Sequence, residues 1–83
     1  MKVTLKLFAT LADYLPEGAR NNQVEMEVAE ATSVGEIIER LRLPPALTHL
    51  VLINGGFVPP EERFGRHLQE GDQLAVWPPI AGG

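Results

Sequence analysis

The sequence contains no cysteine, which excludes disulfides, thiol nucleophiles, iron–sulfur ligation and every cysteine-based zinc site. Histidine is scarce too: only His49 and His67 are present, 18 residues apart, and two such residues do not predict a zinc cluster. No apolar run approaches the roughly 20 residues that a membrane helix needs, and the N-terminus lacks the apolar core of a signal peptide. We therefore expect a soluble cytoplasmic protein without membrane contacts.

Positive charge is sparse as well. The chain has 7 lysine and arginine residues against 11 aspartates and glutamates, so its net charge is −4. Nucleic-acid binding needs clustered Lys and Arg that neutralise phosphates, and we expect no nucleic-acid partner. With 83 residues, of which 45% are apolar and 22% charged, the chain has the composition of one globular domain with a thin core.

Alternating side chains predict two strands in the first part of the chain. Residues 3–7 and 24–28 place apolar side chains at every second position, which is typical of half-buried strands. The lysines of the first segment and the glutamates of the second suit a pairing between them. In between, residues 11–15 predict a short helical turn that Pro16 and Gly18 terminate.

Further strands are predicted in the second half of the chain. The continuous apolar run at 50–53 predicts a strand that is covered on both sides. The Asn-Gly-Gly turn at 54–56 predicts a hairpin that leads into a short strand at 57–58. A last strand at 74–76 must end before Pro78, because proline cannot donate to a strand ladder.

One helix is predicted after Ser33. Ser33 and Glu36 have the spacing of a capping box, and apolar residues follow at i, i+3, i+4 and i+7. This stripe consists of Val34, Ile37, Ile38 and Leu41. The proline pair at 44–45 ends the helix. The element order predicts an α+β fold in which one helix packs across a small mixed sheet.

The C-terminal residues predict a tail, 78–83, that follows a folded domain of residues 1–77. The tail consists of Pro78, Pro79, Ile80, Ala81, Gly82 and Gly83. The two prolines favour an extended segment directed away from the last strand. The two glycines have no side chains and can enter a narrow slot that a Cβ would block. A stiff base with a flexible tip is suited to present the terminal carboxylate to another protein's active site.

Several blocks of the sequence resemble the ubiquitin-like sulfur carriers of the MoaD/ThiS group. Residues 7–16 (Leu-Phe-Ala-Thr-Leu-Ala-Asp-Tyr-Leu-Pro) are similar to the opening of MoaD-like proteins, and the helix after Ser33 lies where theirs does. Residues 68–74 are similar to the turn before their last strand, and residues 78–83 are similar to the MoaD-type tail. The turn at 53–59 is closer to ThiS, but the proline pair of the tail favours MoaD. The resemblance implies the β-grasp (ubiquitin-like) fold.

In this family the carboxylate of the terminal glycine, here Gly83, is the working group. The resemblance implies that a partner of the MoeB/ThiF type, similar to ubiquitin-activating enzymes, adenylates this carboxylate with ATP. Sulfur from a persulfide then displaces AMP and leaves a C-terminal thiocarboxylate. Similarity to MoaD implies that the sulfur goes to a cyclic pterin precursor on the large, MoaE-type subunit of molybdopterin synthase, for molybdenum cofactor biosynthesis.

The resemblance also implies a carrier subunit that has no active site, tightly bound cofactor or metal of its own. ATP is used by the activating partner, and the basic groups that bind pyrophosphate or pterin belong to the partners, which suits an acidic carrier. In the tail, Gly82 provides clearance and Pro78 and Pro79 set the approach, while Ala81 and Ile80 help to position the end of the chain.

Docking to such partners should require an apolar surface patch. By strand alternation Phe8 and Trp77 point outward from the first and last strands, and Phe57 lies near a turn. If the first and last strands are neighbours, as in the β-grasp fold, Phe8 and Trp77 share one face near the tail. The alternative is that Trp77 covers the core.

Functions other than molybdopterin synthesis also fit a tail that ends in two glycines. A ThiS-like carrier for thiamin thiazole synthesis, or a carrier for another sulfur pathway such as tRNA thiolation, has the same tail. A ubiquitin-like modifier joins its terminal glycine to a lysine of a target protein, and a plain interaction domain makes no use of this glycine.

Glu61 and Glu62 resemble a catalytic carboxylate pair, but adjacent loop residues usually point apart. We expect Arg63, Arg66 and His67 to be surface residues of this charged loop.

Overall fold

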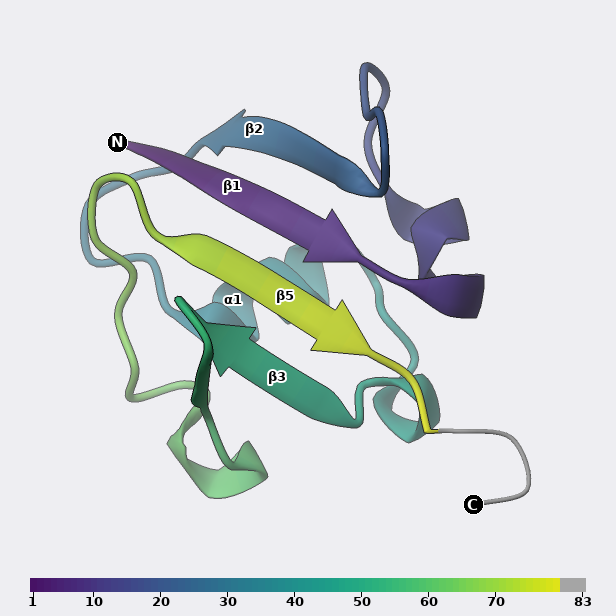
Figure 1. The fold of residues 1–83 in the computed structure, drawn as a ribbon. Coiled ribbons are helices and arrows are strands. Elements are labelled where there is room, and N and C mark those ends of the chain that lie inside the picture. Colours follow the sequence, from purple (N-terminus) through teal and green to yellow (C-terminus); the bar gives the residue numbers. More distant parts are fainter. Residues whose placement is uncertain (80–83) are drawn as a thin grey trace.

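The computed structural model describes residues 1–79, which form a five-stranded sheet with an α-helix behind it (Figure 1). The strands are β1 (Lys2–Leu7), β2 (Gln23–Glu27), β3 (Leu50–Ile53), β4 (Gly56–Phe57) and β5 (Gln73–Trp77). The helices are α1 (Val34–Arg40) and the short 3-10 helices η1 (Ala9–Tyr14), η2 (Pro45–Leu47) and η3 (Pro60–Glu62). The predicted order of strands and helix is confirmed, and with it the α+β class.

The sheet is mixed because its first and last strands, β1 and β5, are parallel neighbours. The strand order is β2-β1-β5-β3-β4, and the other three pairings are antiparallel. The predicted pairing of β1 with β2 is confirmed, with Lys2 opposite Glu27. Because β1 and β5 run in the same direction, they end at the same end of the sheet, where the chain leaves β5 (Figure 1).

Helix α1 begins as its capping box predicts. The Ser33 hydroxyl accepts a hydrogen bond from the Glu36 backbone N–H at 3.1 Å, and the Glu36 carboxylate accepts one from the Ser33 N–H at 3.3 Å. The first two helical N–H groups donate to carbonyls of the loop after η3. The helix ends at Arg40, ahead of the proline pair, and the chain turns away at Arg42, whose φ is +57°.

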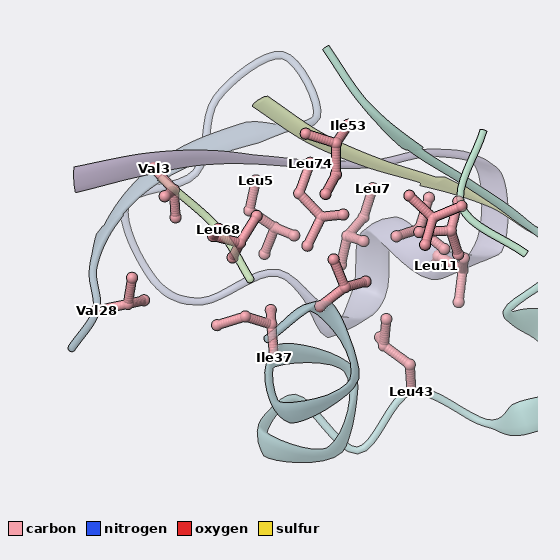
Figure 2. Close-up of a cluster of buried hydrophobic side chains, with 14 residues drawn as sticks. Val3, Leu5, Leu7, Leu11, Val28, Ile37, Leu43, Ile53, Leu68 and Leu74 are labelled. Atoms are coloured by element: carbon pink, nitrogen blue, oxygen red, sulfur yellow. The ribbon is translucent and has the colours of Figure 1, made fainter. Parts of the chain in front are cut away.

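The hydrophobic core lies between α1 and the sheet (Figure 2). Leu5 and Leu7 of β1 and Leu74 of β5 point toward Ile37 of α1, and η1 adds Leu11; all five are buried. The remaining buried apolar side chains are Val3, Val28, Val34, Leu43, Val51, Ile53, Val58, Leu68 and Val76. Among residues 1–79, no helix is long and apolar enough to cross a membrane.

Strand β3 differs from its prediction. It was expected to be covered on both sides, but only Val51 and Ile53 are buried, whereas Leu50 and Leu52 are half-buried. The reason is that α1 covers one face of the sheet only. The predicted hairpin forms, and the two residues between β3 and β4, Asn54 and Gly55, have φ +49° and +85°, as a tight two-residue turn requires. Its return strand is Gly56–Phe57 instead of the predicted 57–58.

Candidate functional site

The sheet face turned away from α1, here called the outer face, carries an apolar strip. On β3 and β5, Leu50 lies opposite Trp77 and Leu52 lies opposite Ala75, and Leu52 also faces Phe57 of β4. The residues that alternate with them on β3 and β5 are buried in the core, so these side chains point away from it. The outer face of β1 and β2 is polar instead.

Phe8 completes the strip by stacking on Trp77. The ring centroids are 4.1 Å apart and the ring planes differ by 6°. The expectation that these two aromatic residues share one face is therefore met, and Trp77 does not cover the core. Phe8 is half-buried rather than exposed because its ring lies against the indole. Phe57, on the edge strand, is 58% exposed.

Trp77, Pro78 and Pro79 form what we call the tail root. The Trp77 carbonyl accepts a hydrogen bond from the His49 N–H at 3.2 Å, Pro78 is half-buried and Pro79 is exposed. The tail therefore leaves the sheet beside the Phe8–Trp77 stack. The predicted roles of the next residues stay predictions, because these lie outside the described part of the chain: Ile80, Ala81, Gly82 and Gly83.

Arg63 is not the solvated loop charge that the sequence indicated. Its two terminal nitrogens donate to the carbonyls of Thr48 at 3.1 Å and His49 at 3.2 Å. Its Nε is buried and has no hydrogen-bond partner among residues 1–79, and burial lowers the pKa of the guanidinium. Nothing in the loop sequence pointed to this role, whereas Arg66 is exposed as expected.

The remaining charged candidates do not gather into a site. Glu61, Glu62 and His67 are all exposed. Within the described residues, no three of the side chains that ligate metals come close enough to hold an ion. Phe64, next to Arg63, is 58% exposed and borders an apolar groove beside α1 that also includes Ile38. The outer face and the tail root thus remain the best-formed candidate site.

The N-terminus is fixed at the other end of β1. The Met1 ammonium pairs with the Glu27 carboxylate at 2.8 Å and donates to the Val28 carbonyl at 2.8 Å. The hydrogen bond between the two charged groups raises the pKa of the Met1 amine and lowers the pKa of Glu27. This ion pair ties β1 to β2 and lies away from the tail root.

Comparisons with known proteins identify a matching family and several solved structures with a similar fold. A family model described as Mut7-C ubiquitin matches residues 1–81. The solution structure of the Haloferax volcanii HVO 2177 protein is 27% identical, with a TM-score of 0.76 over 100% of this chain and 87% of that one. The crystal structure of SAMP1 (small archaeal modifier protein 1) from Haloferax volcanii is 25% identical, with a TM-score of 0.70 over 100% of both chains.

A more distant structure shares the fold alone. It is a chain of the complex of subunits 1 and 2 of the molybdopterin-converting factor from Helicobacter pylori, 14% identical, with a TM-score of 0.61 over 100% of both chains. No curated protein matches the sequence. The predicted β-grasp, ubiquitin-like fold is confirmed by the family model and by these structures.

Proposed function

This chain belongs to the Mut7-C ubiquitin family, and from that premise we propose that it is a ubiquitin-like sulfur carrier that holds sulfur as a Gly83 thiocarboxylate. The observation that carries the proposal is the apolar strip, which reaches the tail root through the stack of Phe8 on Trp77. A partner that binds this strip through an apolar surface is placed next to the tail that it must act on. Phe8, Phe57 and Trp77 are its proposed partner-binding residues.

The proposed chemistry proceeds at the carboxylate of Gly83. On a MoeB/ThiF-type partner this carboxylate attacks the α-phosphorus of ATP and expels pyrophosphate, so that a poor acyl donor gains AMP as a leaving group. A persulfide sulfur of the partner machinery attacks the acyl carbon and expels AMP. A second thiol then reduces the acyl disulfide, leaving the thiocarboxylate and an oxidised partner. The thiols come from the partners, because this chain has no cysteine, and ATP is bound by the activating partner.

We assign the sulfur first to molybdopterin synthesis, with a MoaE-type large subunit as acceptor. The assignment is supported by the MoaD-like tail at 78–83 and by the fold shared with the Helicobacter pylori molybdopterin-converting factor, in which subunits 1 and 2 form a complex. A ThiS-like carrier for thiamin, or a carrier for tRNA thiolation, is the alternative within the same class. The cytoplasmic location expected from the sequence belongs to the same proposal.

A ubiquitin-like modifier is the second candidate function. It is favoured by the 25% identity to SAMP1, which is named a modifier protein, over 100% of both chains. A modifier uses the same activated Gly83 but transfers it to a lysine amine of a target protein instead of accepting sulfur. In this second function the apolar strip and the tail root would again place a partner beside Gly83, so the likeness to SAMP1 is what favours the modifier.

The intact mass of the chain purified from its own cell separates the two candidates. A carrier should show the mass increase of one oxygen-to-sulfur exchange, located at Gly83 by fragmentation. A modifier should instead appear in covalent ladders with other proteins. Deletion of Gly83 should abolish either signal; if sulfur is still carried or targets are still joined without this residue, the proposed role of the tail is wrong.

The acceptor pathway is tested by reconstitution. The thiocarboxylate form is incubated separately with a MoaE-type subunit plus the cyclic pterin precursor and with a ThiS-dependent thiazole synthase plus its own substrates. Loss of sulfur from Gly83 is followed by mass. We expect transfer with the MoaE-type subunit only. Transfer to the thiazole synthase alone would overturn the molybdopterin assignment while leaving the carrier function intact.

A further inference from the structure

Arg63 keeps its head group against the protein, although loop arginines usually extend theirs into water. Its Nε is buried and has no hydrogen-bond partner among the described residues. An unpaired buried N–H group is unfavourable and needs an explanation. The other two guanidinium nitrogens are both hydrogen-bonded to backbone carbonyls.

The two terminal nitrogens hold one short stretch of backbone. They donate to the carbonyls of Thr48 and His49, at 3.1 Å and 3.2 Å. These are consecutive residues just before β3, so the planar guanidinium spans two successive peptide groups. A lysine ammonium, as a compact charge on a flexible stem, does not reproduce this fixed fork.

The same stretch of backbone holds the tail root. The His49 N–H donates to the Trp77 carbonyl at 3.2 Å, and Leu50 pairs with Trp77 across β3 and β5. A continuous series of contacts thus runs from Arg63 through His49 to the last residue before Pro78.

We infer that Arg63 is a positioning residue that fixes the tail root through His49. In this role it sets where the tail leaves the sheet relative to the apolar strip, without touching the reacting carboxylate. The inference rests on the proposed function in one respect: the position of the tail root matters because the tail must present Gly83 to a partner. The Arg63–His49–Trp77 contacts themselves can be tested on the isolated chain.

The test compares Arg63→Gln and Arg63→Lys with Arg66→Gln, a matched control on an exposed arginine of the same loop. Trp77 is the only tryptophan, so its fluorescence reports on the tail root. Arg63→Gln should shift the emission to longer wavelength and speed hydrogen exchange of the His49 amide at least tenfold. Arg63→Lys should give a smaller change, and Arg66→Gln should match the wild type.

Hydrogen exchange at a core amide distinguishes a local effect on the tail root from a loss of stability of the whole fold. Exchange at Ile37, which is buried in α1, should stay near the wild-type rate in Arg63→Gln while exchange at His49 rises. Unchanged Trp77 emission and His49 exchange in this variant would overturn the inference. So would equal acceleration at His49 and Ile37, or the same changes in the Arg66→Gln control.

The consequence for sulfur transfer is measured separately. In protein purified from its own cell, the thiocarboxylate fraction should be several-fold lower for Arg63→Gln than for the wild type and unchanged for Arg66→Gln. If the wild type carries no sulfur, the carrier function fails, but the fluorescence and exchange results still decide whether Arg63 holds the tail root. A normal sulfur load in Arg63→Gln would contradict the positioning role.

Discussion

The rings of Phe8 and Trp77, 4.1 Å apart, bury apolar surface on a face that the core does not use. Phe8→Ala should lower the free energy of unfolding by about 1–2 kcal/mol, less than the ~3–5 kcal/mol lost with a fully buried phenylalanine. Urea unfolding measures the change. Phe57→Ala is the matched control: its ring is 58% exposed, so its effect should stay within about 0.5 kcal/mol. Equal losses in the two variants would show that the stack contributes nothing.

Gly35 lies beneath the ring of Phe64, and a Cβ at this position would meet ring carbons at 2.7 Å. Gly35→Ala should therefore destabilise the wild type, although the same change inside a helix ordinarily gains about 1 kcal/mol. In a Phe64→Ala background it should become stabilising by about 0.5–1 kcal/mol. Unfolding of all four proteins of this double-mutant cycle measures the coupling, and additive effects would contradict the contact.

At the scale of single residues, the sequence predicted the position of side chains that follow strand alternation. It did not predict the position of Arg63, which depends on hydrogen bonds to backbone far away in the chain. Phe8 and Trp77 could be placed on one face once their strands were taken as neighbours. The acceptors of Arg63 are carbonyls 14 and 15 residues earlier in the chain. Carbonyls are present at every residue, so no sequence pattern marks the two that an arginine will bind.

Strands β1 and β2 are tied together by the ion pair of the Met1 ammonium with Glu27. The ammonium lowers the pKa of Glu27, so its contribution to stability is present above the ordinary value of 4.5 and is lost as the pH falls through the lowered pKa. The carboxylate raises the pKa of the Met1 amine, so that contribution is complete below the ordinary value of 8.0 and is lost as the pH rises through the raised pKa.

The ion pair should therefore stabilise the chain between about pH 4.5 and pH 8.0. The difference in melting temperature between the wild type and Glu27→Gln should be largest in this window and should shrink on both sides. Thermal unfolding across the pH range measures it. Glu25→Gln, on the same strand opposite Thr4, is the control and should show no such window. A difference that does not vary with pH would exclude this ion pair as its cause.

At the scale of elements, local signals were sufficient wherever the interaction itself is local. The capping box at Ser33 forms as predicted, and a hairpin turn forms within the predicted 54–56, because the partners in each lie within a few residues. Strand β3 was predicted to be covered on both sides because its residues are all apolar. Which face is covered depends on where α1 packs, and α1 leaves Leu50 and Leu52 half-buried.

At the scale of the whole molecule, the fold and the tail should be separable. All buried core residues lie between Val3 and Val76, so a chain ending at Pro79 should keep its melting temperature within about 2 °C of the full chain. The same truncation should abolish sulfur loading, because Gly83 is gone. Thermal unfolding and intact mass measure the two properties. A large fall in melting temperature would mean that the last residues contribute to the fold.

The sequence by itself determined the order of strands and helix, the likeness to ubiquitin-like carriers and the candidate role of Gly83. The order follows from periodicity, caps and turns, all of which are read within a few residues. The likeness and the candidate role of Gly83 rest instead on the resemblance of residues 7–16, 68–74 and 78–83 to MoaD-like proteins. Only the tertiary structure decided that Leu50, Leu52 and Ala75 form the apolar strip together with the aromatic residues. It also decided that Arg63 reaches the tail root through His49. Those contacts depend on β5 lying between β1 and β3, a long-range arrangement that brings together residues far apart in the chain.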